Sequence, residues 1–524
     1  MKTILKRTLA IGTLLIFSLG CEDVLETEPT GFASPDVFYQ TEEDLIIAIN
    51  GIYDTFQGNQ WGGAFVHIQP HLDGATENAV VAESFEYGFP LVARGTMSPA
   101  NAGVITEWKW NYGYEAISRI NTILQILDEG NVEISAENEG KLRGEARTLR
   151  AFVYSELIAL YGDVPLILAP ITPEEAEDVT RTDKATVLEA IVEDLDFAAE
   201  NLETTPNRGE EGRPTLQTAL AFKGKALLYN ERYEEAAATF QQIIDLEGDA
   251  VILDPDYLSL FDGSNEASDE ILFSIQYAEG STGEGTFIAI HYAPNIPGNS
   301  ADGFQSVWYT QKLLDAYYMT DGLPFDESPL YDPANPFENR DPRLKMTFYL
   351  PGDQYRGLVL DSINIGRTGF TESTPEGFVP FSLRKWISDQ DARFSASNSS
   401  ADLVLLRYAD VLLMYAEAKN EVSGPDASVY SAINKVRARA GMPDVPTGLS
   451  QEQMRAAIRH ERIVEFIGEG TRYYDLLRWR TAEEVIPSIP ELESRIFDPT
   501  ANYRWPIPQN AIDQSPGIEQ NPGY

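Results

Sequence analysis

Two stretches of this 524-residue chain read as pairs of helices, and such pairs restrict the fold more than any other feature of the sequence. In residues 215–246 the apolar positions follow helical spacing, and the pattern breaks near Asn230 and Glu231. Small residues occur where the two helices must approach and large ones lie between them, at Ala226, Tyr229, Tyr233, Ala236 and Phe240. Residues 402–441 repeat this arrangement, with a turn at Gly424. Because one helix pair cannot bury its apolar faces alone, the sequence predicts a stacked helical array.

The spacing of small and large residues in these pairs is similar to that of tetratricopeptide units. Other stretches are also predicted to be helical. Thr41 is the expected N-cap of a helix with an acidic first turn, and a longer helix is expected to end at Gly162, with Pro165 preventing its continuation. The predicted helices are 41–56, 105–127, 141–161, 186–202, 215–229, 231–246, 402–422, 426–441 and 450–470.

The middle of the chain has a different character. Residues 250–400 are rich in Gly, Pro, Asn, Asp and Ser, with short extended runs such as 270–278. We therefore predict a mainly α fold, a helical-repeat scaffold of about four helix pairs with an inserted loop-rich subdomain containing a few short strands. The expected regions are an N-terminal helical region 32–249, the insert 250–400, and C-terminal helices with a tail, 401–524.

The N-terminus has the order of a secretory signal peptide over residues 1–20. Lys2, Lys6 and Arg7 precede an apolar run that is too short to span a bilayer, and Gly20 supplies a small residue before Cys21. Cys21 is the only cysteine, so it cannot form an internal disulfide. The pattern indicates a bacterial lipoprotein whose acylated Cys21 begins a short acidic tether, 21–31. The alternative is an ordinary signal peptide followed by a buried cysteine.

The composition excludes several classes of protein. The formal charge of −43 becomes −46 without residues 1–20, and such a surface repels nucleic-acid phosphates and anionic headgroups. A hydrophobic share of 43% is ample for a large core, which argues against disorder. No second segment is apolar over a length that would cross a membrane.

Several charged clusters resemble catalytic groups, but each has a simpler interpretation. Arg407 with Asp410, then Arg462 with Glu465 and Glu469, have helical spacing and are interpreted as structural ion pairs between packed helices. Arg472, Asp475 and Arg478 are interpreted in the same way. The zinc-helix pattern that starts at His460 fails because position 464 is Val. We therefore expect no catalytic residue, no metal and no cofactor.

Taken together, several motifs resemble the SusD/RagB family of outer-membrane nutrient-binding lipoproteins. Single motifs are modest evidence, but their order and number cover nearly the whole mature chain. They are GEARTLRAFVYSELIALYGDVPLI (144–167), GRPT (212–215), NRDPRL (339–344), LLRYADVLLMYAEAKNE (405–421), INKVRARAG (433–441), ERIVEFIGEGTRYYDLLRW (461–479), WPIPQNAI (505–512) and QNPGY (520–524).

The resemblance implies a function as well as a fold. Proteins of this family are tetratricopeptide-like, lie on the outer face of the outer membrane, and cover a SusC-like TonB-dependent transporter. They bind glycans, or in some members peptides, for import, and they are not enzymes. For this chain the resemblance thus implies an oligosaccharide ligand, a transporter partner, a lipid anchor and no nucleic acid.

The family's binding sites draw on two loop regions, which correspond here to 57–104 and 280–309. Sugar recognition combines aromatic faces with carboxylate, amide and guanidinium groups, and both regions supply them. Trp108, Trp110, Trp386, Trp479 and Trp505 lie in or beside motifs and are interpreted as core. The ligand-binding candidates are Trp61, Asp73, Tyr87, Arg94, Asn101, Tyr292, Phe304, Trp308 and Tyr309.

Two alternatives remain open from the sequence. The same fold with a peptide ligand would favour an open groove lined by backbone hydrogen-bonding partners. A surface hydrolase would need two carboxylates at a fixed separation in a cleft, and the sequence shows no signature of such a pair.

Overall fold

The structure is a computed structural model that describes residues 38–57, 65–66, 69–81, 87–278, 285–294, 303–360, 377–379, 381–388, 398–489 and 494–524. The predicted signal peptide, Cys21 with its tether, and Trp61 lie outside these residues. The boundaries of the three predicted regions stay predictions.

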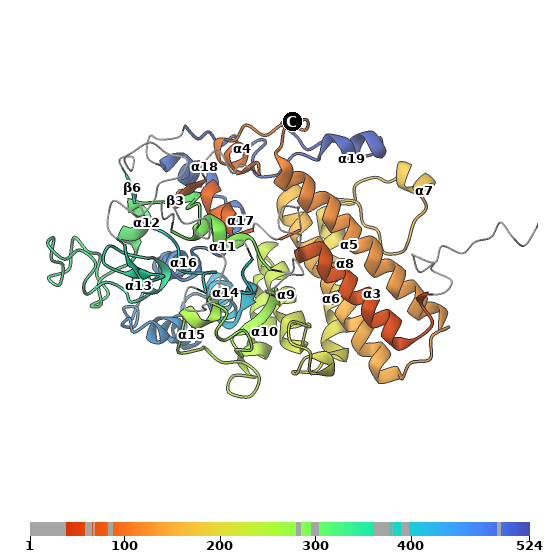
Figure 1. Cartoon of the computed structure of the whole chain (residues 1–524), viewed down its shortest axis with the longest axis horizontal. Coiled ribbons are helices and arrows are strands. Elements are labelled where there is room, and N and C mark those ends of the chain that lie inside the picture. Colours follow the sequence, from red (N-terminus) through yellow and green to blue (C-terminus); the bar gives the residue numbers. More distant parts are fainter. Residues whose placement is uncertain are drawn as a thin grey trace, which may run out of the picture.

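Eight long helices pack one after another in the order of the chain. Each contacts the next, so that they form four successive pairs, and Figure 1 shows the first four helices side by side at one end of the molecule. This arrangement confirms the predicted mainly α, tetratricopeptide-like scaffold. The helices are α3 (Glu42–Gln57), α5 (Val104–Glu129), α6 (Ala136–Tyr161), α8 (Lys184–Asn201), α9 (Leu216–Tyr229), α10 (Tyr233–Ile244), α14 (Tyr408–Ser423) and α15 (Ala427–Arg439).

Local sequence signals fix the ends of several of these helices. Thr41 Oγ1 accepts a hydrogen bond from the Asp44 N–H, as expected for an N-cap of α3. Thr215 caps α9 in a reciprocal capping box with Thr218. Gly162, at φ 78°, follows the last residue of α6, where the sequence predicted the end.

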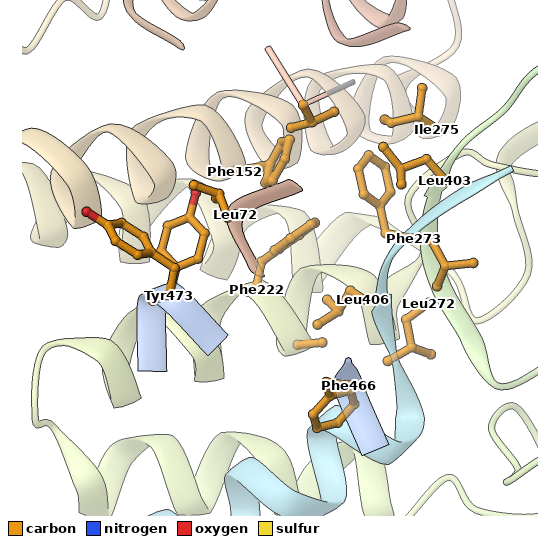
Figure 2. Packing of buried hydrophobic residues seen from close by; sticks show 14 of the residues in the cluster. Leu72, Phe152, Phe222, Leu272, Phe273, Ile275, Leu403, Leu406, Phe466 and Tyr473 are labelled. Atoms are coloured by element: carbon orange, nitrogen blue, oxygen red, sulfur yellow. The ribbon is translucent and has the colours of Figure 1, made fainter. Parts of the chain in front are cut away.

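The core joins the scaffold to a two-stranded sheet. Strand β2 (Ile271–Ile275) pairs antiparallel with β7 (Leu403–Arg407). The rings of Phe152, Phe222 and Phe273 form a mutual cluster with centroids 5.1–5.7 Å apart, and Figure 2 shows all three between α6, α9 and this sheet. Three elements far apart in sequence are therefore fixed by one group of aromatic side chains.

One predicted helix is partly wrong. Residues 402–422 were expected to be helical throughout, but residues 403–407 form β7 and α14 begins only at Tyr408. Leu403, Val404 and Leu406 are all buried, and a short continuous apolar run suits a strand covered on both faces as well as it suits a buried helix. Pairing with β2 decides between the two, and that pairing is not visible in local periodicity.

The predicted helix over 450–470 is also interrupted. Helix α16 (Gln451–Phe466) ends before Gly470, which adopts φ 72° and precedes α17 (Thr471–Arg478). A Cβ on Gly470 would lie 2.2 Å from the carbonyl oxygen of Gln69. The glycine therefore allows the α16–α17 turn to approach the 3-10 helix η1 (Gln69–Ala75) closely.

Residues 250–400 are loop-dominated as predicted, with short elements among the described residues. A three-stranded sheet runs in the order β1 (Ala79–Val81), β3 (Val307–Thr310), β6 (Phe378–Val379). Strands β4 (Gln354–Tyr355) and β5 (Leu358–Val359) form a separate pair. The other short elements are α4 (Phe89–Arg94), α7 (Pro173–Glu177), η3 (Asn207–Gly209), η4 (Leu258–Leu260), α11 (Ile288–Tyr292), α12 (Gln311–Ala316), α13 (Arg343–Thr347), α18 (Ala482–Val485), η5 (Ile486–Ser488) and α19 (Gln509–Gln514).

Candidate functional site

The two loop regions predicted to supply the binding site are joined by a sheet. Strand β1 comes from the first region and β3 from the second, and they pair antiparallel with Val80 opposite Trp308 and Ala79 opposite Tyr309. The Thr310 N–H also donates to the carbonyl of Asn78 (2.8 Å). Residues more than two hundred positions apart are thus held side by side.

Arginines from the C-terminal part of the chain fix η1 beneath this sheet. Arg472 forms an ion pair with Glu77 (2.6 Å). Arg495 donates to the backbone carbonyls of Thr76 (2.5 Å), Gly74 (2.9 Å) and Ala79 (3.0 Å). Guanidinium groups suit this task because one side chain offers donors in several directions.

Asp73 belongs to this support. Its carboxylate is fully buried and accepts a hydrogen bond from the Gly468 N–H at 2.6 Å. Burial raises the pKa of Asp73 to about 7 because the single hydrogen bond and the more distant Lys385 only partly offset the loss of hydration. As placed, Asp73 fastens η1 to the turn after α16 and does not reach solvent.

A group of rings lies beside the sheet and next to the start of α5. The ring of His71 stacks on Phe89 (5.6 Å) and meets His291 edge-on (4.6 Å). Tyr87 contacts His291 (5.8 Å) and lies 5.5 Å from Trp108 with its ring tilted by 47°. Within this group of rings, His71, Phe89 and His291 are buried, whereas Tyr87 and Trp108 remain partly exposed. Both of the exposed rings carry a hydrogen-bonding group, a phenol hydroxyl or an indole N–H.

The backbone holds Tyr87 against α5. Tyr87 adopts φ 24°, which is uncommon for a residue with a side chain, and its carbonyl accepts from the Ile105 N–H (2.8 Å). The adjoining Gly88 packs so tightly on Gly103 that a Cβ on Gly88 would lie 2.5 Å from the Gly103 Cα. A strained residue kept in place by its surroundings is typical of functional sites.

The nine candidates from the sequence fall into three groups by location. Trp61 lies outside the described residues. Asp73, Tyr292, Trp308 and Tyr309 are at most 1% exposed, and their side chains pack inside the protein. Tyr87, Arg94 and Phe304 are half-buried and Asn101 is exposed, so these four can be reached from solvent. Ligand contact stays a prediction for every one of them.

The buried candidates have packing partners that explain their location. Trp308 packs with Val80, Phe378 and Ile489 in a small apolar cluster. Tyr309 meets Phe348 edge-on at 4.9 Å. When a strand is covered on both faces, the side chains on both of its faces are buried. The amino-acid composition of the strand does not reveal this.

Sequence reasoning placed Trp108 in the core, whereas the structure leaves it partly exposed beside Tyr87. Trp110, Trp386 and Trp505 are buried as expected, and Trp479 is half-buried. The signal for Trp108 was present, because positions two apart on a helix point to different sides. With Trp110 inward on α5, Trp108 had to lie away from that face.

The charged clusters act as structural ion pairs between packed elements, as interpreted. Arg407 on β7 contacts Glu465 (2.6 Å), Glu469 (2.9 Å) and Glu270 (3.0 Å), and all four are buried. Arg462 joins Asp410 (2.6 Å) to Asp475 (2.7 Å). Burial opposes ionisation of Glu465, yet the cations Arg439, Arg407 and Arg343 outweigh it and hold its pKa well below the usual range.

No group of three or more His, Cys, Asp or Glu side chains that could hold a metal ion occurs among the residues that the structure describes. Over the same residues, no helix is both long enough and apolar enough to cross a bilayer.

The fold and these features define a helical-repeat protein with a loop-rich insert and an aromatic surface where insert and scaffold meet. Comparison with known sequences identifies its family. The profile of the SusD family matches residues 269–524, and a SusD-like profile described as starch-binding associating with outer membrane matches residues 60–228. The chain belongs to the SusD/RagB family, which confirms the resemblance drawn from the motifs.

Individual relatives agree over nearly the full length. A SusD-like protein of Formosa agariphila is 28% identical, and the match covers 99% of each chain. The crystal structure of a SusD-like carbohydrate-binding protein from Bacteroides fragilis is 27% identical and has a TM-score of 0.81, over 92% of this chain and 100% of the other. A surface glycan-binding protein from Bacteroides thetaiotaomicron, in complex with laminarihexaose, shares the fold at 21% identity with a TM-score of 0.71, over 92% and 100%.

Proposed function

We propose that the protein binds an oligosaccharide at the cell surface and delivers it to a SusC-like TonB-dependent transporter for import. The observation that carries this proposal is the surface formed by Tyr87 and Trp108 at the junction of the two loop regions. Aromatic rings offer their faces to the C–H side of a sugar while keeping a polar group free for hydroxyls. The carbohydrate-binding protein from Bacteroides fragilis, similar over nearly the whole chain, supports the same ligand class.

The polar groups suited to sugar hydroxyls lie on the first loop region. Arg94 ends α4, and Asn101 precedes the Gly88–Gly103 contact that holds Tyr87. Phe304, whose N–H donates to the Ile290 carbonyl (2.5 Å), adds a half-buried ring next to α11. The proposed glycan surface therefore consists of Tyr87, Trp108, Phe304, Arg94 and Asn101.

Binding to an oligosaccharide panel by the lipid-free chain, with Tyr87→Ala and Trp108→Ala, tests this surface. Loss of one stacking ring costs about 1 kcal/mol, so each variant should bind about fivefold more weakly. Tyr233→Ala on α10 is the matched control, because Tyr233 is also half-buried but lies on the scaffold. Glycan binding that is unchanged in both test variants would contradict the proposed surface, and binding of peptides alone would favour the peptide-binding alternative.

We also propose that the protein has no enzymatic activity. The buried carboxylates Glu465, Glu469 and Asp475 are all held by arginine or lysine, which leaves them poor proton donors. Analysis of glycan chain length after long incubation provides the test. Shortened oligosaccharides would contradict the proposal and favour a surface hydrolase.

The lipid anchor at Cys21 and the position at the outer face of the outer membrane are parts of the same proposal. The profile described as associating with outer membrane supports a location at the outer membrane. Two or three acyl chains suffice for stable anchoring. Mass spectrometry of the mature N-terminus should show an acylated Cys21, and Cys21→Ala should release the chain from the membrane fraction. Protease shaving of intact cells checks the orientation.

A transporter partner is proposed from family membership. A protein that covers a barrel of this kind would bury a wide, partly polar surface. Purification from outer membranes in mild detergent should recover a SusC-like partner with the chain. Recovery of the chain alone under several gentle conditions would count against a stable complex.

A further inference from the structure

A pocket of about 260 Å³ lies in the helical scaffold, and none of its lining residues belongs to the proposed glycan surface. Its walls come from the second half of α6, the end of α9, the start of α8, α17 and the segment around residue 504. The volume is just below the range of about 300–1,000 Å³ for pockets that hold drug-sized ligands. The space therefore suits one small molecule and not an extended chain.

The charge of this pocket is opposite to that of the protein. Five basic side chains line it (Lys184, Lys225, Arg478, Arg480 and Arg504), against the two acidic residues Glu156 and Glu231. The whole chain has 82 acidic and 39 basic residues, so a basic excess in one small space is unusual for it. Attraction of an anion into a cleft of this sign is strengthened by the low-dielectric walls.

Two of these charges are already neutralised by neighbours. Glu156 forms an ion pair with Lys109 (3.0 Å) and accepts from the Tyr474 hydroxyl (2.5 Å). Arg478 binds Glu417 (2.5 Å) and Asp475 (2.8 Å). Both residues are buried in arrangements that a ligand would not need to change.

The other four cations have no ion pair among the described residues. The ammonium of Lys225 lies 5.5 Å from the centre of the Tyr229 ring, and the guanidinium of Arg480 lies 4.3 Å from that of Tyr503. Burial, and after it the neighbouring Arg504 and Arg480, lowers the pKa of Lys184, while Asp163 and Glu231 oppose this shift. An anion beside Lys184, Arg480 and Arg504 would relieve the repulsion of Lys184 by the two guanidinium groups.

The remaining walls are apolar or aromatic. Phe152 and Phe222, whose rings meet in the core in Figure 2, contribute to the lining, with Ile158, Leu477 and Tyr474 beside them. A small inorganic ion would leave much of this apolar surface uncovered. A body the size of one sugar ring that carries a single charge matches both the walls and the cations.

We propose that this pocket, between α6, α9 and α17, binds the carboxylate, sulfate ester or phosphate ester of a small anionic ligand about the size of a monosaccharide. Lys184 and Lys225 would contact the anion from the half-buried side, and Arg480 with Arg504 from the exposed side. The proposal does not depend on the proposed glycan surface, since the two share no residue.

Calorimetry of the lipid-free chain with four probes tests the proposal: glucuronate, glucose 6-sulfate, glucose 6-phosphate and glucose. At least one charged probe should bind, glucose should bind at least tenfold more weakly, and affinity should fall as sodium chloride is raised. Whichever charged probe binds best identifies the anion. Equal binding of glucose and the charged probes, or no binding of any charged probe, would overturn the proposal.

Two variants link binding to the pocket. Arg504→Ala and Lys184→Met should each weaken the best probe at least tenfold, while Lys345→Ala, a cation exposed on α13 outside the pocket, should not. Arg504 is exposed, so its variant is expected to fold, and equal melting temperatures confirm this. Unchanged affinity in Arg504→Ala and Lys184→Met would show that the anion binds elsewhere and would overturn the assignment.

Discussion

Replacing Arg407 by methionine tests how the buried charges hold the scaffold to the insert. Arg407 Nε and Nη2 donate to Glu469 (both 2.9 Å), and Nη1 donates to Glu270 (3.0 Å) and Glu465 (2.6 Å). Methionine fills a similar volume without the charge, so the variant leaves three buried carboxylates short of one cation. Removing one partner of a buried ion pair typically costs about 3–5 kcal/mol.

The cost should lie near the lower end of that range, because each carboxylate keeps a second cation. Glu469 keeps Lys385 (2.7 Å), Glu465 keeps Arg343 (2.8 Å), and Glu270 keeps Arg439 (3.2 Å). We therefore expect Arg407→Met to lower the free energy of unfolding by about 3 kcal/mol at neutral pH. The loss should shrink as the pH falls, because protonation of the buried carboxylates then removes the negative charge that Arg407 had balanced.

Urea unfolding, followed by circular dichroism, measures this effect. Arg232→Met is the matched control, because Arg232 also pairs with more than one carboxylate, Glu189 (2.7 Å) and Glu235 (2.5 Å), but both of these are exposed. Exposed pairs contribute about 0–1 kcal/mol. If Arg407→Met were no more destabilising than Arg232→Met, the reasoning on the buried cluster would be refuted.

Three further predictions concern stability. Asp402 accepts a hydrogen bond from the Tyr277 N–H (2.9 Å), and burial, reinforced by Glu266, raises the pKa of Asp402 to about 8. The contribution of Asp402 to the free energy of unfolding is therefore full below about pH 4 and is lost as the pH rises through 8. As the pH rises from 5 to 7, the free energy of unfolding of Asp402→Asn should increase relative to that of the wild type by about 1.4 kcal/mol per pH unit. Urea unfolding measures this difference, and a difference that stays constant with pH would contradict the prediction. Gly470→Ala should lower the melting temperature more than Gly130→Ala, because both glycines have positive φ but only the Cβ at 470 would meet backbone, and equal losses would refute the close approach. Trp308→Ala should cost about 3–5 kcal/mol of unfolding free energy, since Trp308 is 1% exposed, and a loss below 1 kcal/mol would show that the ring does not pack as described.

Local patterns predicted most of the scaffold. Helices α5 and α9 lie where the 3.6-residue periodicity put them, and α6 ends before Gly162 as predicted, although it begins at Ala136 instead of residue 141. Strand β7 was missed because its pairing with β2 joins residues more than a hundred positions apart, and local periodicity carries no record of such a contact.

The contact between the two loop regions was predictable, but the burial of their side chains was not. The two loop regions do meet, through β1 and β3, yet Trp308 and Tyr309 on that sheet lie inside. Which side of a strand is covered depends on what packs there, here Ile489 and Phe348, from other parts of the chain. The partial exposure of Trp108, in contrast, could have been predicted from its position two residues before the buried Trp110.

Calorimetry of the lipid-free chain, residues 22–524, against oligosaccharides from plants, algae and microbes, with peptides included, tests the central claim most directly. The account predicts binding of one glycan class that is weakened about fivefold in Tyr87→Ala and Trp108→Ala and unchanged in Tyr233→Ala. Binding of peptides and of no glycan would contradict it.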